Sequence, residues 1–123
     1  MKIEFRLITA VIAVVLASTV VSEAAPSRVL DEDAALALLD RTLKHDKVYE
    51  KRISLDCISY GTEERTKAYF EFVLREIHNA KCGGDPETSH VIDRYRVYRG
   101  SGKIERYEVA EDTWHAYKGA QTE

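Results

Sequence analysis

The sequence predicts an α+β domain in which one amphipathic helix packs on a curved antiparallel sheet of about four strands. Leucines recur at helical spacing between Asp31 and Lys44. Apolar and charged residues then alternate at strand spacing from Val91 to Tyr98 and from Lys103 to Val109, on either side of a Gly-containing turn. A helix with one apolar stripe needs a surface to cover it, and the strands supply that surface.

The N-terminal residues have the features of a secretory signal peptide. Lys2 and Arg6 precede an uncharged run from Leu7 to Val21, and the small residues Ser22 and Ala24 follow it. The run is shorter than the roughly 20 apolar residues that a transmembrane helix needs. We expect cleavage after Ala24. The predicted organisation is a signal peptide (1–24), a linker (25–30), a single domain (31–118) and a tail (119–123).

The charges nearly balance, with 18 Lys and Arg residues against 21 Asp and Glu residues. The net charge of −3 gives no general attraction to nucleic acid or to an anionic membrane. Because of the signal peptide we expect a periplasmic or secreted protein, whose candidate partner is another envelope or secreted protein. No nucleic acid, and no membrane after signal cleavage, is expected as a partner.

The helix is expected to begin after Asp31, whose carboxylate can accept hydrogen bonds from the free amides of the first turn. The two acidic residues that follow suit the positive end of the helix dipole. Leu36, Leu39 and Leu43 form one apolar stripe, which is predicted to face the sheet.

Two strands are predicted between the helix and the last hairpin. In the first, from Tyr49 to Tyr60, one face would carry Ile53, Leu55 and Cys57. The stretch from Tyr69 to His78 fits two patterns. As a strand it places Phe70, Phe72 and Leu74 inward, and as a helix it aligns Tyr69, Val73, Ile77 and Ala80. We favour the strand.

The last two strands are expected to form a hairpin through a two-residue type II′ turn at Gly100 and Ser101, because that turn requires glycine first. This register sets an apolar pair and an opposite-charge pair across the strands, namely Val97 with Ile104 and Arg96 with Glu105. Four strands that curl around one helix resemble the architecture of cystatin-like domains.

Cys57 and Cys82 are predicted to form a disulfide, because small exported domains gain from a covalent link in an oxidising compartment. A tight hairpin through Gly61 would separate them by ~40 Å, whereas a disulfide needs Cα atoms within about 7 Å. We therefore expect the chain from Ile58 to Lys67 to travel back along the sheet as a connection.

A dense group of polar residues, glycines and a proline follows the stretch that ends at His78. Glycine permits positive φ and the Asp-Pro pair shapes a turn, so this segment is interpreted first as a disulfide-pinned loop that joins two strands. The alternative is that this rigid loop contacts a ligand or a protein. The residues assigned to this binding loop are Glu76, His78, Gly83, Gly84, Asp85, Pro86 and Thr88.

Two kinds of chemistry are weighed at this loop. A carboxylate and imidazoles could bind zinc, and the candidate ligands would be Glu76, His78, Asp85, His90 and Asp93. Their spacing matches no standard site, so a polar edge cluster is favoured. Cys82 beside His78 could be a nucleophile with its base, but a disulfide would consume the thiol. We therefore expect no catalytic residue, no metal ligand and no cofactor.

Arginine and tyrosine, which dominate interface hot spots, are concentrated in the last hairpin. Alternating charge on the outer face of a sheet favours an ordinary solvated face, and the alternative is a partner surface. The residues assigned to this surface are Arg94, Arg96, Tyr98, Arg99, Arg106 and Trp114. The segment from Trp114 to Tyr117 either extends that surface or closes the end of the core.

Several motifs resemble those of small exported proteobacterial proteins of unassigned function. They are Asp56-Cys57, Tyr69-Phe70-Glu71-Phe72, Glu76-x-His78-x3-Cys82-Gly83-Gly84-Asp85-Pro86-x-Thr88, and Arg94-Tyr95-Arg96-Val97. The resemblance implies export and a single sheet-rich domain, and it transfers no catalytic residue.

The sequence therefore favours an exported, non-catalytic binding module, such as an inhibitor or immunity-type protein that acts on an envelope enzyme. One alternative is a metal-dependent or thiol-based enzyme centred on Glu76, His78 and Cys82. Another is a structural component of the envelope.

Overall fold

The computed structural model describes residues 29–119. The predicted signal peptide (1–24), most of the predicted linker and the end of the predicted tail lie outside the described residues. Between residues 29 and 119, no helix is long and apolar enough to cross a membrane.

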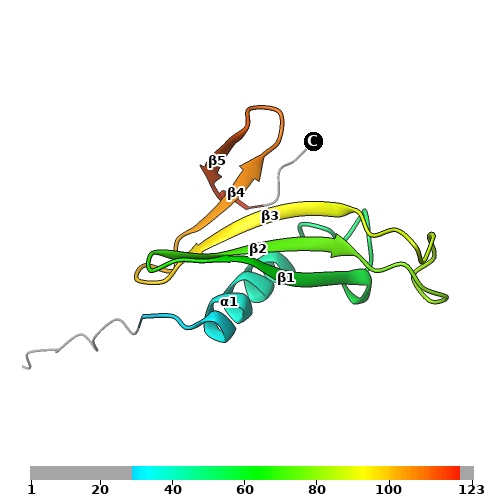
Figure 1. The fold of residues 1–123 in the computed structure, drawn as a ribbon, viewed down its shortest axis with the longest axis horizontal. Coiled ribbons are helices and arrows are strands. Elements are labelled where there is room, and N and C mark those ends of the chain that lie inside the picture. Colours follow the sequence, from blue (N-terminus) through cyan, green and yellow to red (C-terminus); the bar gives the residue numbers. More distant parts are fainter. Residues whose placement is uncertain (1–28, 120–123) are drawn as a thin grey trace, which may run out of the picture.

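The α+β prediction is confirmed. Within the described residues one α-helix, α1 (Glu32–His45), packs on a five-stranded antiparallel sheet (Figure 1). The strands lie side by side in chain order: β1 (Ile58–Arg65), β2 (Tyr69–Glu76), β3 (Val91–Tyr98), β4 (Ile104–Glu108) and β5 (Thr113–Ala116). The β4–β5 hairpin rises on the side of the sheet away from α1. β5 is one strand more than the sequence predicted.

Helix α1 begins as predicted. Asp31 is the N-cap, and its Oδ1 accepts a hydrogen bond of 2.8 Å from the amide of Ala34. Ala35, Leu39 and Leu43 lie at helical spacing and are fully buried. The helix therefore packs through one stripe, and β2 and β3 receive it.

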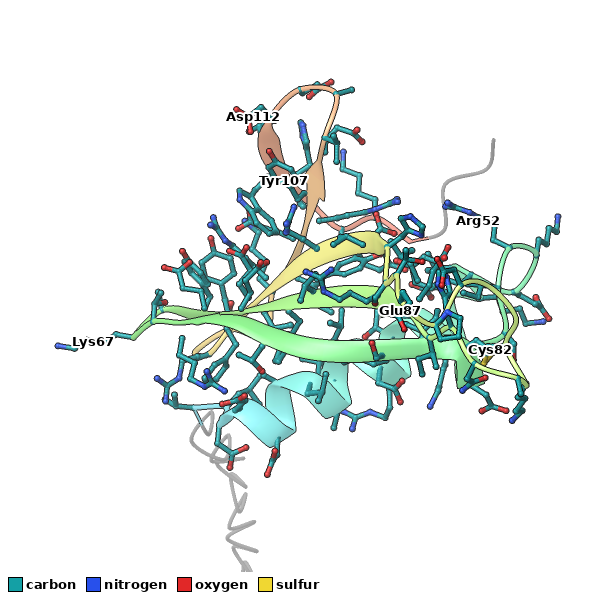
Figure 2. All side chains as sticks on the ribbon, turned by 45° about the vertical axis from the view of Figure 1, so that its right-hand side comes forward. Arg52, Lys67, Cys82, Glu87, Tyr107 and Asp112 are labelled. Carbon is teal, nitrogen blue, oxygen red and sulfur yellow. A yellow bond between two sulfur atoms is a disulfide. The ribbon has the colours of Figure 1, made fainter. Side chains whose placement is uncertain are left out.

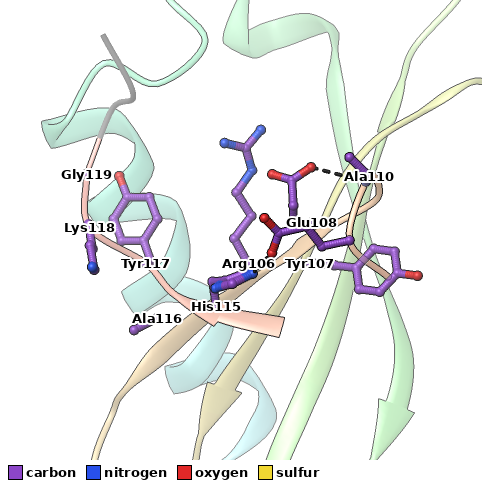
Figure 3. Close-up of a pocket in the computed structure, with 10 residues that line it drawn as sticks. Arg106, Tyr107, Glu108, Ala110, His115, Ala116, Tyr117, Lys118 and Gly119 are labelled. Atoms are coloured by element: carbon purple, nitrogen blue, oxygen red, sulfur yellow. Dashed lines mark hydrogen bonds and ion pairs between the residues drawn. The ribbon is translucent and has the colours of Figure 1, made fainter. Parts of the chain in front are cut away.

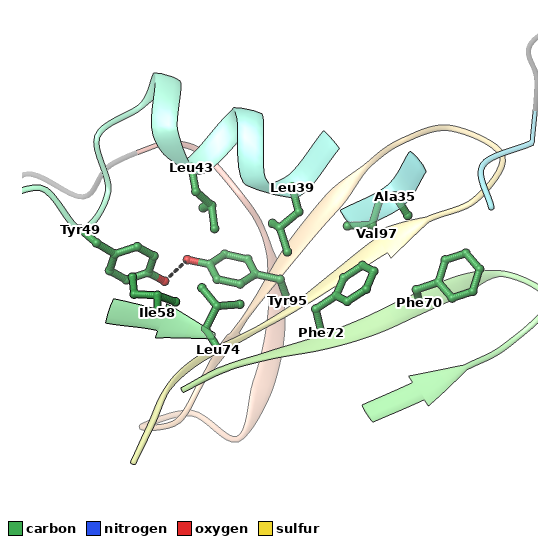
Figure 4. Close-up of a cluster of buried hydrophobic side chains, with 10 residues drawn as sticks. All are labelled: Ala35, Leu39, Leu43, Tyr49, Ile58, Phe70, Phe72, Leu74, Tyr95 and Val97. Atoms are coloured by element: carbon green, nitrogen blue, oxygen red, sulfur yellow. Dashed lines mark hydrogen bonds between the residues drawn. The ribbon is translucent and has the colours of Figure 1, made fainter. Parts of the chain in front are cut away.

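The core lies between α1 and the inner face of the sheet (Figure 4). Phe70, Phe72 and Leu74 of β2 all point into it, which confirms the strand interpretation of this stretch. Tyr95 and Val97 of β3 are fully buried beside them. Burying one large apolar side chain contributes about 1.5–3 kcal/mol, so this cluster provides most of the stabilisation.

The predicted strand from Tyr49 to Tyr60 is wrong over most of its length. The carbonyl of Tyr49 accepts hydrogen bonds from the amides of Arg52 and Ile53, so the chain turns there instead of extending. A short 3-10 helix (Leu55–Cys57) follows, and β1 begins only at Ile58. Tyr49 is nevertheless buried, because its ring fills the core beside Tyr95.

The predicted disulfide between Cys57 and Cys82 is present, with Cα atoms 5.6 Å apart. The chain does not turn at Gly61, which lies opposite Val73 in the middle of β1. It runs back along the sheet as expected, but as a paired strand and not as a connection. The turn lies at Lys67 and Ala68, at the end of the sheet opposite Cys82 (Figure 2).

The β3–β4 register is confirmed, since Val97 lies opposite Ile104 and Arg96 opposite Glu105. The predicted type II′ turn is wrong. Gly102, not Gly100, has positive φ (70°), and its amide donates to the carbonyl of Tyr98 at 2.8 Å. The strands are therefore joined by a longer loop over residues 99–102, and the glycine with positive φ is the last residue of that loop.

Candidate functional site

His78 is the centre of the loop between β2 and β3. Its Nε2 lies 2.7 Å from Oε2 of Glu76, the last residue of β2. Its Nδ1 lies 3.0 Å from the carbonyl oxygen of Asp85 and 3.1 Å from Oγ1 of Thr88. Only 10% of the His78 side chain is exposed, although its neighbours in the loop are largely exposed. The loop is therefore folded around one imidazole.

Gly84 allows this close packing. Its φ is +80°, and a Cβ built at this position would lie 2.6 Å from Cδ2 of His78. Glycine is thus required both for backbone conformation and for space. Of the predicted binding loop, Glu76, Gly84, Asp85 and Thr88 converge on His78, whereas Gly83 and Pro86 are exposed.

His90, the residue immediately before β3, joins this cluster. The amide of Glu76 donates to the carbonyl of His90 at 2.9 Å, which aligns the two residues across the strand ends. Nδ1 of His90 lies 3.7 Å from Oε2 of Glu76, and the rings of His78 and His90 meet edge to face with centroids 5.6 Å apart. The nearest ligand atoms of Glu76, His78 and His90 all lie within 4.8 Å of one another.

The charges in this cluster support each other. The hydrogen bond from His78 lowers the pKa of the Glu76 carboxyl. The same bond, and then the carbonyl of Asp85, raises the pKa of the His78 imidazole. The cluster can therefore hold a positive charge, either a proton or a metal cation, between a carboxylate and two imidazoles.

The other candidates near the loop are engaged elsewhere. The sulfur of Cys82 is bonded to Cys57, so no thiol is available beside His78 in this form of the protein. Asp93 points toward the core, where its carboxylate accepts hydrogen bonds from Tyr49 and Arg106. The side chain of Asp85 accepts from the amide of Glu87 and shapes the turn.

The outer face of the sheet, opposite α1, carries a stack of aromatic rings and one arginine. The guanidinium carbon of Arg96 lies 4.4 Å from the ring centroid of Tyr69 and 4.0 Å from that of Trp114. Tyr98 extends the stack beside Tyr69, with centroids 5.6 Å apart, and Tyr107 extends it beside Trp114, with centroids 5.2 Å apart. We call these five residues the outer-face stack.

Ion pairs surround the outer-face stack. Arg96 donates to Glu71 at 3.1 Å, and Arg94 reaches across β2 to Glu63 at 3.0 Å. A β-bulge between Thr62 and Glu64 breaks the β1–β2 register beside Glu63. The acids and bases of this face therefore neutralise one another.

The predicted partner surface divides between the two faces of the sheet. Arg94, Arg96, Tyr98 and Trp114 lie together on the outer face. Arg106 shares the inner face with Tyr95, its partner in the register, and pairs with Asp93. Arg99 covers the ring of Phe70 at 4.9 Å and donates to backbone carbonyls of Leu30 and Thr66.

A cavity of about 500 Å³ lies between the β4–β5 hairpin and the segment that follows it (Figure 3). Arg106 and His115 line it, but Arg106 is bound to Asp93 and His115 to Glu111. Tyr117 closes the end of the core, and its hydroxyl donates to Asp46 at 2.6 Å. Arg106 and His115 thus serve internal contacts, and we place the candidate sites at the His78 loop and the outer-face stack.

None of the protein-family models, curated proteins or solved structures compared with this chain matches it.

Proposed function

We propose that this protein is an exported, non-catalytic binding module that docks on another envelope or secreted protein through the outer-face stack. The observation that carries the proposal is the position of Arg96 between Tyr69 and Trp114, on the face that α1 leaves uncovered. Tyr, Trp and Arg are the residue types whose truncation costs most in protein interfaces. The export assignment rests on the N-terminal sequence and is supported by the disulfide.

The electrostatics of this face support a protein partner. A partner that covers the stack also removes water from the surrounding charges, which is costly for any charge that lacks a counter-ion. Here Arg94 and Arg96 each hold a carboxylate, so the face can be covered without leaving either guanidinium unpaired. The neutral, aromatic character favours a partner surface with an apolar centre.

The architecture also supports a binding module. We infer a cystatin-like arrangement, in which a curved sheet wraps one helix and presents its other side to a partner. Bulges in β1 and at Ile92, near the start of β3, contribute to the curvature, because a bulge bends its strand and increases local twist.

A capture experiment with matched variants tests the proposal. The oxidised protein, immobilised and exposed to envelope extract, should retain one protein at close to equimolar amount. Trp114→Ala and Arg96→Ala should each weaken that complex by about 2 kcal/mol or more, roughly 30-fold in Kd. Arg41→Ala removes an exposed arginine from α1 and should change nothing. A captured protein that binds all three variants equally would contradict the outer-face assignment.

A further inference from the structure

We propose that Glu76, His78 and His90 form a zinc-binding site at the loop end of the sheet. Two imidazole nitrogens and one carboxylate oxygen make a ligand set that suits Zn²⁺, which is bound by three protein ligands in sites that keep a fourth position open. All three ligand atoms already lie within 4.8 Å of one another. The site is independent of the proposed docking face, because β2 separates Glu76 from Tyr69 by about 23 Å.

The orientation of His78 supports a metal ligand. The carbonyl of Asp85 can only accept a hydrogen bond, so Nδ1 of His78 carries a hydrogen and donates it at 3.0 Å. In the neutral ring, Nε2 then presents a lone pair to the Glu76 carboxylate 2.7 Å away. Two acceptors do not face each other at this distance, so either a second ring proton on Nε2 or a metal cation lies between them. Metal-binding histidines show the same arrangement, with one nitrogen donating to a backbone carbonyl and the other on the metal.

The structure holds His78 in place before any metal binds. Thr88 accompanies the Asp85 carbonyl at Nδ1, Gly84 packs against the ring, and the Cys57–Cys82 bond anchors the loop. His90 supplies the adjustable ligand, because 71% of its side chain is exposed. Zinc bonds of 2.0–2.1 Å in a tetrahedral site separate ligand atoms by about 3.3 Å. The Glu76–His78 distance must widen by roughly 0.6 Å for this, and the Glu76–His90 distance must shorten slightly.

The arrangement leaves coordination positions open toward solvent. Glu76 is 38% exposed and His90 71% exposed, so a bound zinc ion would be reached from outside the protein. The fourth ligand would be water or a donor atom from another molecule. A purely structural Glu76–His78 ion pair would have no use for His90, and this difference separates the two interpretations.

Calorimetric titration of the oxidised, chelator-treated protein with Zn²⁺ tests the site. We expect one zinc ion per chain, and Co²⁺ in its place should give the visible absorption of a four- or five-coordinate ion. His90→Ala and Glu76→Gln should each weaken zinc binding by more than about 100-fold, since loss of an outer partner alone costs about 10- to 100-fold. Thr88→Val, which removes such an outer partner, should fall within that smaller range.

The other two histidines provide matched controls. His45 lies 3.0 Å from Asp46 and His115 lies 2.6 Å from Glu111, so each is an exposed histidine with one carboxylate. His45→Ala and His115→Ala should leave zinc affinity and stoichiometry unchanged. Because the exposed ring of His90 contributes little to packing, circular dichroism and the urea midpoint of His90→Ala should match the parent.

Three results would overturn the site. The first is a folded parent that takes up no Zn²⁺, and the second is a parent that binds Zn²⁺ with the same affinity as His90→Ala. The third is a loss of binding in His45→Ala or His115→Ala, which would place the ion at an ordinary histidine–carboxylate pair. None of these results depends on whether the outer-face stack binds a protein.

Discussion

Asp93 bonds two side chains at the edge of the core, and one of them, Tyr49, continues the network to Tyr95. Its carboxylate accepts two hydrogen bonds from Arg106, at 2.9 and 3.1 Å, and one from the hydroxyl of Tyr49. The Tyr49 and Tyr95 hydroxyls lie 2.7 Å apart. Burial raises the pKa of Tyr95 to about 12 and also raises that of Tyr49, so both remain protonated donors at neutral pH. The network thus gives a nearly buried carboxylate its hydrogen-bond partners.

Asp93→Ala should therefore be strongly destabilising. It leaves the partly buried Arg106 guanidinium without its counter-ion, and breaking a buried ion pair from one side typically costs about 3–5 kcal/mol. Tyr95→Phe should cost only about 0.5–1.5 kcal/mol, because Tyr49 keeps its bond to Asp93. Urea unfolding of the two variants measures both values. Equal losses would show that Asp93 is not the centre of the network.

Gly83 and Gly84 are neighbouring glycines that differ in the space available for a side chain. Both have positive φ, +75° and +80°, but only the Cβ of residue 84 would collide with His78. Gly83→Ala should cost about 1–2 kcal/mol for its left-handed backbone. Gly84→Ala should cost more and should displace the His78 ring, visible as a change in its NMR signals. If both variants behave alike, His78 does not pack on residue 84.

At the scale of elements, Glu32 links the first turn of α1 to β1. Its carboxylate accepts hydrogen bonds from Arg65, at 2.6 and 2.8 Å, and from the hydroxyl of Thr62 at 2.5 Å. Thr62 and Arg65 lie opposite the buried residues Phe72 and Phe70 of β2, so both face the helix. One acidic residue thus caps the helix dipole and attaches the helix to the edge strand.

This link predicts that the stability of the fold depends on pH. The hydrogen bond from Arg65, and then that from Thr62, lowers the pKa of Glu32 below its ordinary 4.5. The contribution of Glu32 to the free energy of unfolding is therefore complete above its ordinary pKa, and it is lost as the pH falls through the lowered pKa of the folded state. Carboxyl NMR titration should show this shift, and Arg65→Gln should move the pKa of Glu32 back upward. Arg41→Gln, on the exposed side of α1, should leave that titration unchanged.

Elements with a strong local pattern were predicted, and those fixed by turns of ordinary residues were not. Helix α1 has an N-cap and a leucine stripe, and β3 and β4 have paired alternation, so all three were predicted. The β1–β2 turn at Lys67 and Ala68 contains no glycine, proline or asparagine. It is closed instead by the hydroxyl of Thr66, which accepts from the amides of Ala68 and Tyr69 at 3.1 and 2.9 Å.

The residues of the candidate sites could likewise be predicted only where a local sequence pattern places them. Glu76 and His78 were grouped because alternate residues of a strand share a face. His90 was one of several possible ligands and could not be placed beside Glu76, because the pairing that brings the two together depends on how a loop of fourteen residues (77–90) folds. Arg99 and Arg106 were assigned to the partner surface by composition. The register places Arg106 inward, and Arg99 lies beyond the end of β3.

For the whole molecule, the disulfide joins two segments that the sheet alone holds weakly. Cys57 ends the irregular segment after α1, and Cys82 lies in the β2–β3 loop. Both lie at the same end of the sheet, where the amide of Ile77 donates to the carbonyl of Cys57 at 2.8 Å. Most of the buried core residues lie on α1, β2 and β3 and not beside this link, so the fold should survive reduction with lower stability.

Cys82→Ser should lower the free energy of unfolding by about 2–5 kcal/mol, because the unfolded chain loses a cross-link that closes a loop of intermediate length. Dithiothreitol should lower the stability of the parent by a similar amount, and it should have no further effect on Cys82→Ser. This control separates the loss of the bond from the packing change at residue 82. Far-UV circular dichroism should stay close to that of the parent, since α1 and the sheet do not depend on the sulfur atoms. A urea midpoint that stays constant while both thiols become titratable would show that the link adds nothing to stability, and that the hydrogen bonds of the loop, including those of His78, hold it.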